Sequence, residues 1–180
     1  LQKHMDRLDK IISAKNELAQ IKQALDVSGI ILVCGSALSG KTHVIYSLLL
    51  EISSRDTSKN IMTLESLAKY NLDGVNQCEL NENVNFNMDK ASRFISFQSP
   101  DIIYLEGVKT KEVFDYFASL VYENKIILME FLANNMEELR NKMAFSDFET
   151  LKSLISCMLF IHSKDNIEVF DKNTIQKYLA

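Results

Sequence analysis

A loop with the residues needed to hold phosphate is the first chemical feature of the sequence. Gly35 is followed by four residues and then by Gly40-Lys41-Thr42, which fits the pattern G-x-x-x-x-G-K-[ST]. The glycines let the backbone curl, so that successive N–H groups point toward phosphate oxygens. Lys41 should reach the β- and γ-phosphates, and the Thr42 hydroxyl should ligate Mg²⁺. The pattern therefore predicts a site for ATP or ADP with Mg²⁺.

The whole loop is predicted to contribute to this site, because phosphate is held largely by backbone N–H groups. The alternative is a tight strand-to-helix turn with an exposed lysine. An apolar run before the loop and an amphipathic run after it favour the nucleotide site. The predicted binding residues are Gly35, Ser36, Ala37, Leu38, Ser39, Gly40, Lys41, Thr42 and His43.

Two acids at strand ends are the catalytic candidates. ATP hydrolysis at such a loop needs one carboxylate in the Mg²⁺ shell and another group that orients the attacking water. Glu106 follows the apolar run 101–105 and is the Walker B candidate, sharing the metal with Thr42. Glu65 ends the run 61–65 and is the candidate for water activation. For each acid the alternative is an ordinary solvated side chain at a strand end.

The elements that must position these residues alternate between strands and helices. A nearly continuous apolar strand such as 125–132 is typical of a parallel sheet covered on both faces. The alternation predicts an α/β fold of the P-loop NTPase (RecA-like) type, with a mainly parallel sheet flanked by helices. Residues 71–87 are rich in Asn and predict turns. The other expected elements are strands before Gly35, at 61–65 and at 101–106; helices at 2–25, 41–54, 88–97, 110–123, 134–143, 146–155 and 173–180; and a hairpin from 158–162 and 167–170.

Composition limits the function classes. The chain has 180 residues, 47% of them hydrophobic, and can bury a sizeable core. The net charge of −4 does not point to a nucleic-acid partner. Cys34, Cys78 and Cys157 are scattered and predict reduced thiols rather than a zinc site or disulfides. No apolar run approaches a membrane span or a secretory signal.

Several runs of residues resemble one family in order and in register. Residues 28–42 resemble the run S-G-I-I-L-V-T-G-P-T-G-S-G-K-S of the type II secretion and type IV pilus assembly and retraction ATPases. Residues 60–65 resemble their aspartate box, N-I-V-T-I-E-D-P. Residues 70–77 are similar to Y-x-L-x-G-I-x-Q, and residues 98–103 to the Q-D-P-D-I-I that leads into Walker B. The resemblance implies a motor ATPase domain, with residues 26–180 as the nucleotide-binding domain and residues 1–25 as the remnant of a linker from a missing N-terminal domain.

The sequence departs from this family mainly at catalytic positions. Glu106 precedes a glycine, whereas the family's acid follows one, and Leu38 replaces the second loop glycine. Ser66 and Leu67 replace an acid and a proline of the aspartate box, and Lys109 and Thr110 replace the Arg and Asp after Walker B. At the histidine box, Lys125 and Leu132 replace both histidines. We therefore expect ATP hydrolysis by the isolated domain to be slow or absent. Two alternatives remain: a divergent motor ATPase, or a non-hydrolysing pseudo-ATPase that assembles with or regulates such a motor.

The resemblance also implies the surroundings of the protein. It implies a homo-oligomer, a hexamer, or assembly with related motor subunits, which could supply arginines to the site in trans. The implied location is the cytoplasm, or the inner-membrane periphery through secretion or pilus platform proteins. A GTPase is a weaker third option, because no N-K-x-D follows the fourth predicted strand. His43 and His162 are lone histidines, and packing or surface roles are favoured over catalysis.

Overall fold

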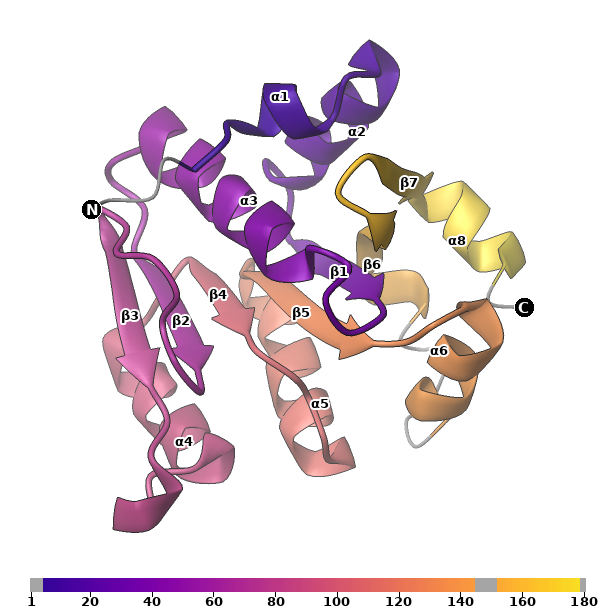
Figure 1. Ribbon diagram of the computed structural model, residues 1–180. Helices are drawn as coiled ribbons and strands as arrows, with labels where there is room; N and C mark the ends of the chain where they lie inside the picture. Colours follow the sequence, from indigo (N-terminus) through magenta and orange to yellow (C-terminus); the bar gives the residue numbers. More distant parts are fainter. Residues whose placement is uncertain (1–4, 145–151, 179–180) are drawn as a thin grey trace.

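One sheet of seven strands organises the part of the chain that the computed structural model describes, residues 5–144 and 152–178 (Figure 1). Its order is β3-β2-β4-β5-β1-β6-β7, and every neighbouring pair is parallel except the hairpin β6-β7. This confirms the expected mainly parallel sheet and the C-terminal hairpin. The strands are β1 (Gly29–Gly35), β2 (Ile61–Glu65), β3 (Val75–Glu79), β4 (Ile102–Leu105), β5 (Ile126–Leu132), β6 (Ile155–Ser163) and β7 (Asn166–Asp171).

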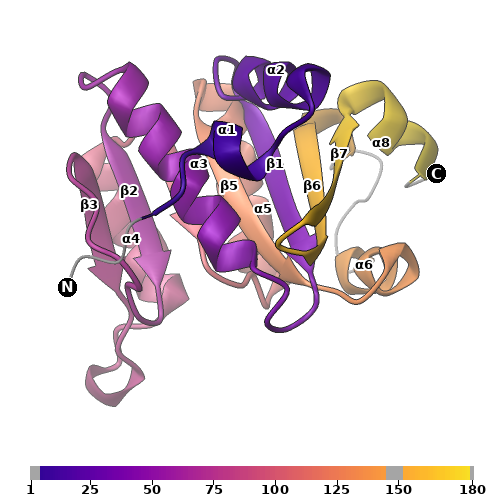
Figure 2. The same cartoon turned by 45° about the horizontal axis from the view of Figure 1, so that its top comes forward.

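Helices cover both faces of this sheet (Figure 2). On one face lie α1 (Leu8–Ile11), α2 (Lys15–Ala24) and α3 (Lys41–Arg55). On the other lie α4 (Met88–Gln98), α5 (Lys111–Ser119), the 3₁₀ turn η2 (Leu120–Glu123), α6 (Met136–Met143) and α8 (Lys172–Tyr178). No helix within the described ranges has the length and apolar character needed to cross a membrane.

The central strand β1 shows why an unbroken apolar run precedes the loop. Every residue of β1 is buried. Successive side chains of a strand point to opposite faces. Accordingly, Ile30 and Leu32 pack on the α5 side, whereas Ile31 and Val33 pack on the α3 side. A strand covered on both faces needs apolar residues at consecutive positions, and β1 has them.

The N-terminal segment is not the single helix that its apolar spacing predicts. The helical geometry stops at Ile12 and resumes after Ala14, both of which have extended backbone. The break lets Leu8 and Ile12 pack against α3, while Ile21 and Ala24 on α2 join the same core closer to β6. The apolar stripe is therefore core packing, as expected, but it is built from two short helices.

A second correction concerns residues 71–87, which were expected to form turns only. They contain β3, which pairs in parallel with β2 at the edge of the sheet. The strand is half-exposed and carries Asn76, Gln77 and Glu79, so it lacks the apolar alternation that identifies a strand. A short 3₁₀ turn, η1 (Glu82–Val84), follows it.

Two expected helix ends also differ. The helix that begins after Thr110 keeps its predicted cap, since the Thr110 hydroxyl accepts from the Val113 N–H, but its last turn is the 3₁₀ turn η2. The capping box predicted at 146–149 lies outside the described residues. Residues 152–154 are helical, and β6 already begins at Ile155, so the helix does not include that residue.

Candidate nucleotide-binding site

The phosphate-loop residues lie between the end of β1 and the start of α3, at the carboxyl edge of the sheet (Figure 1). Gly40 has a φ of 103° and Leu38 a φ of 63°, so the chain passes twice through the left-handed region. A Cβ on Gly35 would lie 2.4 Å from the Ile161 carbonyl oxygen and 2.6 Å from Ser39 Oγ. Glycine at position 35 is therefore required by the close approach of β6.

The amino end of α3 is left open to an anion. Gly40 offers no side-chain cap, and the first turn carries no acid. The N–H groups of Lys41, Thr42 and His43 have no partner within the helix, and the helix dipole makes this end positive. Ser39 Oγ is buried and finds no hydrogen-bond partner in the described part of the chain. These groups fit a phosphate, as the loop pattern predicts.

The Lys41 side chain is turned into the loop. It is 7% exposed, and its Nζ donates to the Ser36 carbonyl oxygen at 2.6 Å. The same Nζ lies 3.7 Å from Oε1 of Glu130, which is 14% exposed. The ammonium that should bind the phosphates is therefore shared between a backbone carbonyl and a partly buried carboxylate.

Glu130 was not identified from the sequence. It lies on β5, opposite Val33 of β1, and its Oε2 accepts a hydrogen bond from the Tyr104 hydroxyl of β4 at 2.7 Å. Burial raises the pKa of Glu130, whereas Tyr104 and Lys41 act to lower it. Burial also raises the pKa of Tyr104, and the Glu130 charge adds to this rise. The sequence feature that could have identified Glu130 is its position as the single acid within the apolar run 126–133.

Glu65, the candidate for water activation, is 2% exposed at the end of β2. Its Oε1 accepts from the Thr63 hydroxyl at 2.5 Å, and its Oε2 accepts from the Tyr46 hydroxyl of α3. Tyr46 OH also accepts from the Lys69 N–H at 2.9 Å. Both carboxylate oxygens are thus engaged by protein groups between β2 and α3.

Glu106, the Walker B candidate, lies just beyond β4. Its Oε2 accepts from both the N–H and the hydroxyl of Ser66, each at 2.5 Å. Glu106 is thus hydrogen-bonded to the segment after β2. In the described ranges no hydrogen bond links it to Thr42. Its charge nevertheless acts to raise the pKa of Glu130, which places both carboxylates in one electrostatic neighbourhood.

The side chains of the two described histidines His43 and His162 contact acids outside the phosphate loop. His43 Nε2 is 3.2 Å from Asp6 Oδ2, so its ring faces the segment before α1, and only its backbone N–H belongs to the loop. His162 Nε2 is 3.2 Å from Glu168 Oε1 on the hairpin. Among the described residues, no cluster of three His, Cys, Asp or Glu side chains could hold a metal ion unaided. Mg²⁺ commonly binds through few protein groups together with substrate phosphates, as the prediction for Thr42 and Glu106 requires.

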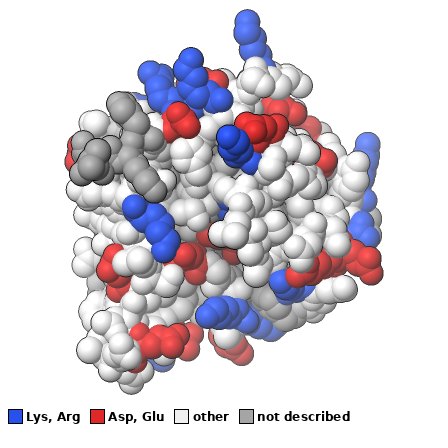
Figure 3. All heavy atoms as spheres, viewed as in Figure 1, with Lys and Arg blue, Asp and Glu red and all other residues white. Residues whose placement is uncertain are grey.

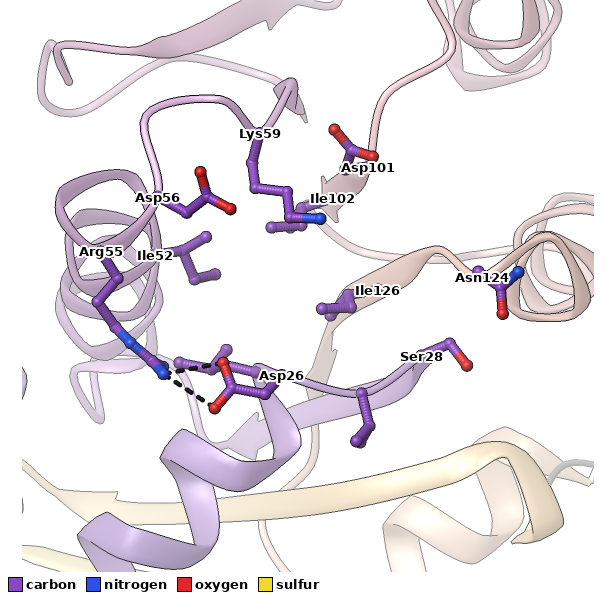
Figure 4. A pocket seen from close by; sticks show the side chains of 12 residues that line it. Asp26, Ser28, Ile52, Arg55, Asp56, Lys59, Asp101, Ile102, Asn124 and Ile126 are labelled. Atoms are coloured by element: carbon purple, nitrogen blue, oxygen red, sulfur yellow. Dashed lines mark hydrogen bonds and ion pairs between the residues drawn. The ribbon is translucent and has the colours of Figure 1, made fainter.

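The surface outside the loop offers two further observations. Basic and acidic side chains are interspersed on the face shown in Figure 3. A hollow of about 330 Å³ lies at the opposite, amino edge of the sheet (Figure 4). Arg55 and Asp26 form an ion pair at its rim, with nitrogen–oxygen distances of 2.8 and 2.9 Å. None of the predicted site residues lines it.

Comparison with known proteins decides the family. Residues 2–120 match the family described as type II/IV secretion system protein. The chain belongs to this family. It is 39% identical over 84 residues to the type II secretion system protein E of Aeromonas hydrophila, a match covering 47% of this chain and 16% of that protein. It is 36% identical over 96 residues to the type IV pilus assembly ATPase PilB of Myxococcus xanthus, covering 53% of this chain and 17% of PilB. The matched segments thus span less than a fifth of these relatives.

Solved structures confirm the RecA-like P-loop fold of this family member. The pilus retraction motor PilT with bound ADP matches with a TM-score of 0.79 at 17% identity, covering 98% of this chain and 57% of PilT. The ATPase DotB of Legionella pneumophila matches with a TM-score of 0.74 at 14% identity, covering 96% and 56%. The likeness extends over almost the whole chain, including β6 and β7 beyond the family match.

Proposed function

We propose that this chain is the nucleotide-binding domain of a motor-type ATPase subunit from a type II secretion or type IV pilus system. Its loop binds ATP or ADP with Mg²⁺. The supporting observation is the open amino end of α3, where uncapped N–H groups and the Lys41 ammonium adjoin one loop, together with the Ser39 hydroxyl, which has no hydrogen-bond partner among the described residues. The structure of PilT with bound ADP, a protein of the same fold, supports this assignment.

Each residue of the site has a distinct role in this proposal. The N–H groups of residues 35–43 and the ammonium of Lys41 hold phosphate oxygens. The Thr42 hydroxyl ligates Mg²⁺, with Glu106 in the metal shell, and Glu65 orients the attacking water. The bound magnesium nucleotide supplies the phosphoryl group and the metal charge.

Hydrolysis by this domain alone is slow or absent. Glu65 and Glu106 are both engaged by hydrogen bonds from neighbouring protein groups. The family's histidines and the arginine after Walker B, which would stabilise charge on the transferred phosphoryl group, are replaced. The second candidate function follows from the same contacts: a pseudo-ATPase that binds nucleotide and assembles with, or regulates, a related motor.

Thermal unfolding tests the binding half of the proposal. Millimolar MgADP or MgATP should raise the melting temperature of the wild-type chain, because a ligand that binds the folded state stabilises it. Lys41→Ala should remove this shift. Lys59→Ala, which removes a lysine at the opposite edge of the sheet, should keep it. Absence of any shift in the wild-type chain would contradict nucleotide binding.

Steady-state phosphate release by the full-length protein separates the two functions. Measurable turnover that Lys41→Ala abolishes supports a motor ATPase, whereas nucleotide binding without turnover supports the pseudo-ATPase. Brisk turnover by the isolated chain would contradict the expected slow hydrolysis.

The assembly of the protein is also a proposal. We infer a homo-hexamer or a mixed ring with related motor subunits, with arginines supplied by a neighbouring subunit or by an N-terminal domain joined through residues 1–25. The inferred place is the cytoplasm or the inner-membrane periphery, through secretion or pilus platform proteins.

A further inference from the structure

The ion pair of buried Lys41 and partly buried Glu130 is the feature of the site that nucleotide binding does not explain. The Lys41 Nζ and Glu130 Oε1 atoms are 3.7 Å apart, and both side chains are largely buried. A phosphate loop needs its lysine for phosphate oxygens. Here a protein carboxylate already lies beside that lysine and offsets part of its positive charge.

Glu130 lies between the loop strand and the strand that precedes Glu106. Its strand, β5, separates the loop strand β1 from the Walker B strand β4. The Tyr104 hydroxyl of β4 donates to Glu130, and the charge of Glu106 reaches it. The carboxylates of Mg²⁺ coordination and water activation act at the γ-phosphate. Glu130 thus lies between the loop lysine and the strand that precedes Glu106, the two places from which a terminal phosphate is served in the proposed function.

The position of the Glu130 side chain is well constrained. Its neighbours Met129 and Phe131 are buried in the core, so the strand around it is anchored on the opposite face. Tyr104 is 1% exposed and holds one carboxylate oxygen, while Lys41 faces the other. A carboxylate held in this way cannot be displaced as easily as a surface acid can.

We propose that Glu130 is a built-in counter-ion of Lys41 that makes this loop prefer nucleoside diphosphates to triphosphates. A diphosphate can share Lys41 with Glu130 through its β-phosphate, whereas a triphosphate brings the further negative charge of its γ-phosphate beside a fixed carboxylate. Two neighbouring negative charges repel each other more strongly in a partly buried site than in water, because the effective dielectric constant is lower there. This preference rests on the proposed nucleotide binding and specifies which class of nucleotide, the diphosphate, the loop binds more tightly.

Titration calorimetry with MgADP and with the magnesium complex of a non-hydrolysable ATP analogue tests the preference on the full-length chain. We expect the wild-type chain to bind MgADP about tenfold more tightly than the analogue, as a repulsion of this kind implies. Glu130→Gln keeps the size of the side chain and an acceptor for Tyr104 but removes the charge. It should tighten analogue binding about tenfold and change MgADP binding by less than about threefold.

Two further variants make the test selective. Glu123→Gln makes the same change at an exposed acid just before β5 and should leave the ratio of affinities unchanged. Glu130→Asp retains the charge but withdraws it by one methylene, and it should reduce the preference without removing it. The aspartate variant also serves if the glutamine variant does not fold.

Three results would overturn the inference. Equal affinities for the two nucleotides in the wild-type chain would do so while leaving nucleotide binding intact. An unchanged ratio in Glu130→Gln together with lost phosphate release would make Glu130 a catalytic residue instead. Absence of binding by both nucleotides would remove the inference and the proposed function together.

Discussion

The Tyr46 hydroxyl of α3 donates a hydrogen bond to the Glu65 carboxylate at the end of β2. Glu65 is buried. The pKa of Tyr46 is raised, mainly by burial of its own hydroxyl and secondly by its hydrogen bond to Glu65. The helix that begins at the phosphate loop is thereby connected to the acid that was expected to activate water. A movement of α3 on nucleotide binding would therefore change the hydrogen bond that holds Glu65.

Replacing Tyr46 with Phe should destabilise the protein measurably. The change removes a donor to a buried carboxylate and the acceptor of the Lys69 N–H. A hydrogen bond to a charged group contributes about 1.5–3 kcal/mol, so we expect a loss of about that size in the free energy of unfolding. Urea denaturation measures it. Tyr70→Phe is the matched control, because that ring packs on Tyr46 with centroids 5.2 Å apart. Equal losses for the two variants would show that the Glu65 bond contributes nothing.

Replacing Gly35 with Ala should damage both the fold and the loop. The new methyl group would lie 2.4 Å from the Ile161 carbonyl oxygen, a backbone atom that cannot move aside freely. Overpacking of this kind typically costs about 1–3 kcal/mol, and the displaced loop should lose its nucleotide-induced thermal shift. Gly107→Ala is the control, because a Cβ there would have no atom within 4 Å from the described residues beyond its two chain neighbours, although its φ of 72° adds some strain. A smaller effect at Gly35 than at Gly107 would contradict the close approach of β6.

Replacing Leu38 with Gly should stabilise the protein. Leu38 is fully exposed, with a relative accessibility of 103%, and its φ of 63° is costly for a residue with a Cβ. Relief of this strain is worth about 1 kcal/mol, which exceeds the added freedom of glycine in the unfolded chain. Ala37→Gly, at the exposed neighbour, should be neutral or destabilising. Denaturant midpoints compare the two variants, and destabilisation by Leu38→Gly would disprove the strain.

The three cysteines should differ in reactivity. Burial raises the pKa of Cys157 to about 12 and raises that of Cys34 as well, so neither forms thiolate at neutral pH. Cys78 is only partly buried on the edge strand β3, and its pKa is raised by that partial burial. In the native protein at pH 8, a thiol reagent should modify Cys78 first. Mass spectrometry of the labelled peptides checks this order, and early labelling of Cys34 would indicate that β1 opens.

The sequence by itself determined the loop and its flanks. The pattern from Gly35 to Thr42 is a local rule of spacing, and the apolar run before it predicts a strand buried on both faces. Glu65 and Glu106 could also be assigned to the ends of β2 and β4, because the end of an apolar run is visible in the chain. Local chemistry was enough for these features.

Only the tertiary structure decided which groups meet. Glu130 reaches Lys41 because β5 lies beside β1, and strand order depends on crossovers that no local pattern encodes. The edge strand β3 was missed because it pairs on one side only and so can be polar. Glu65 ends β2 and Glu106 follows β4, yet their hydrogen bonds to Tyr46 and Ser66 come from segments distant in the sequence. Spacing along the chain determines which residues can bind phosphate, and packing between elements determines which charges they meet there.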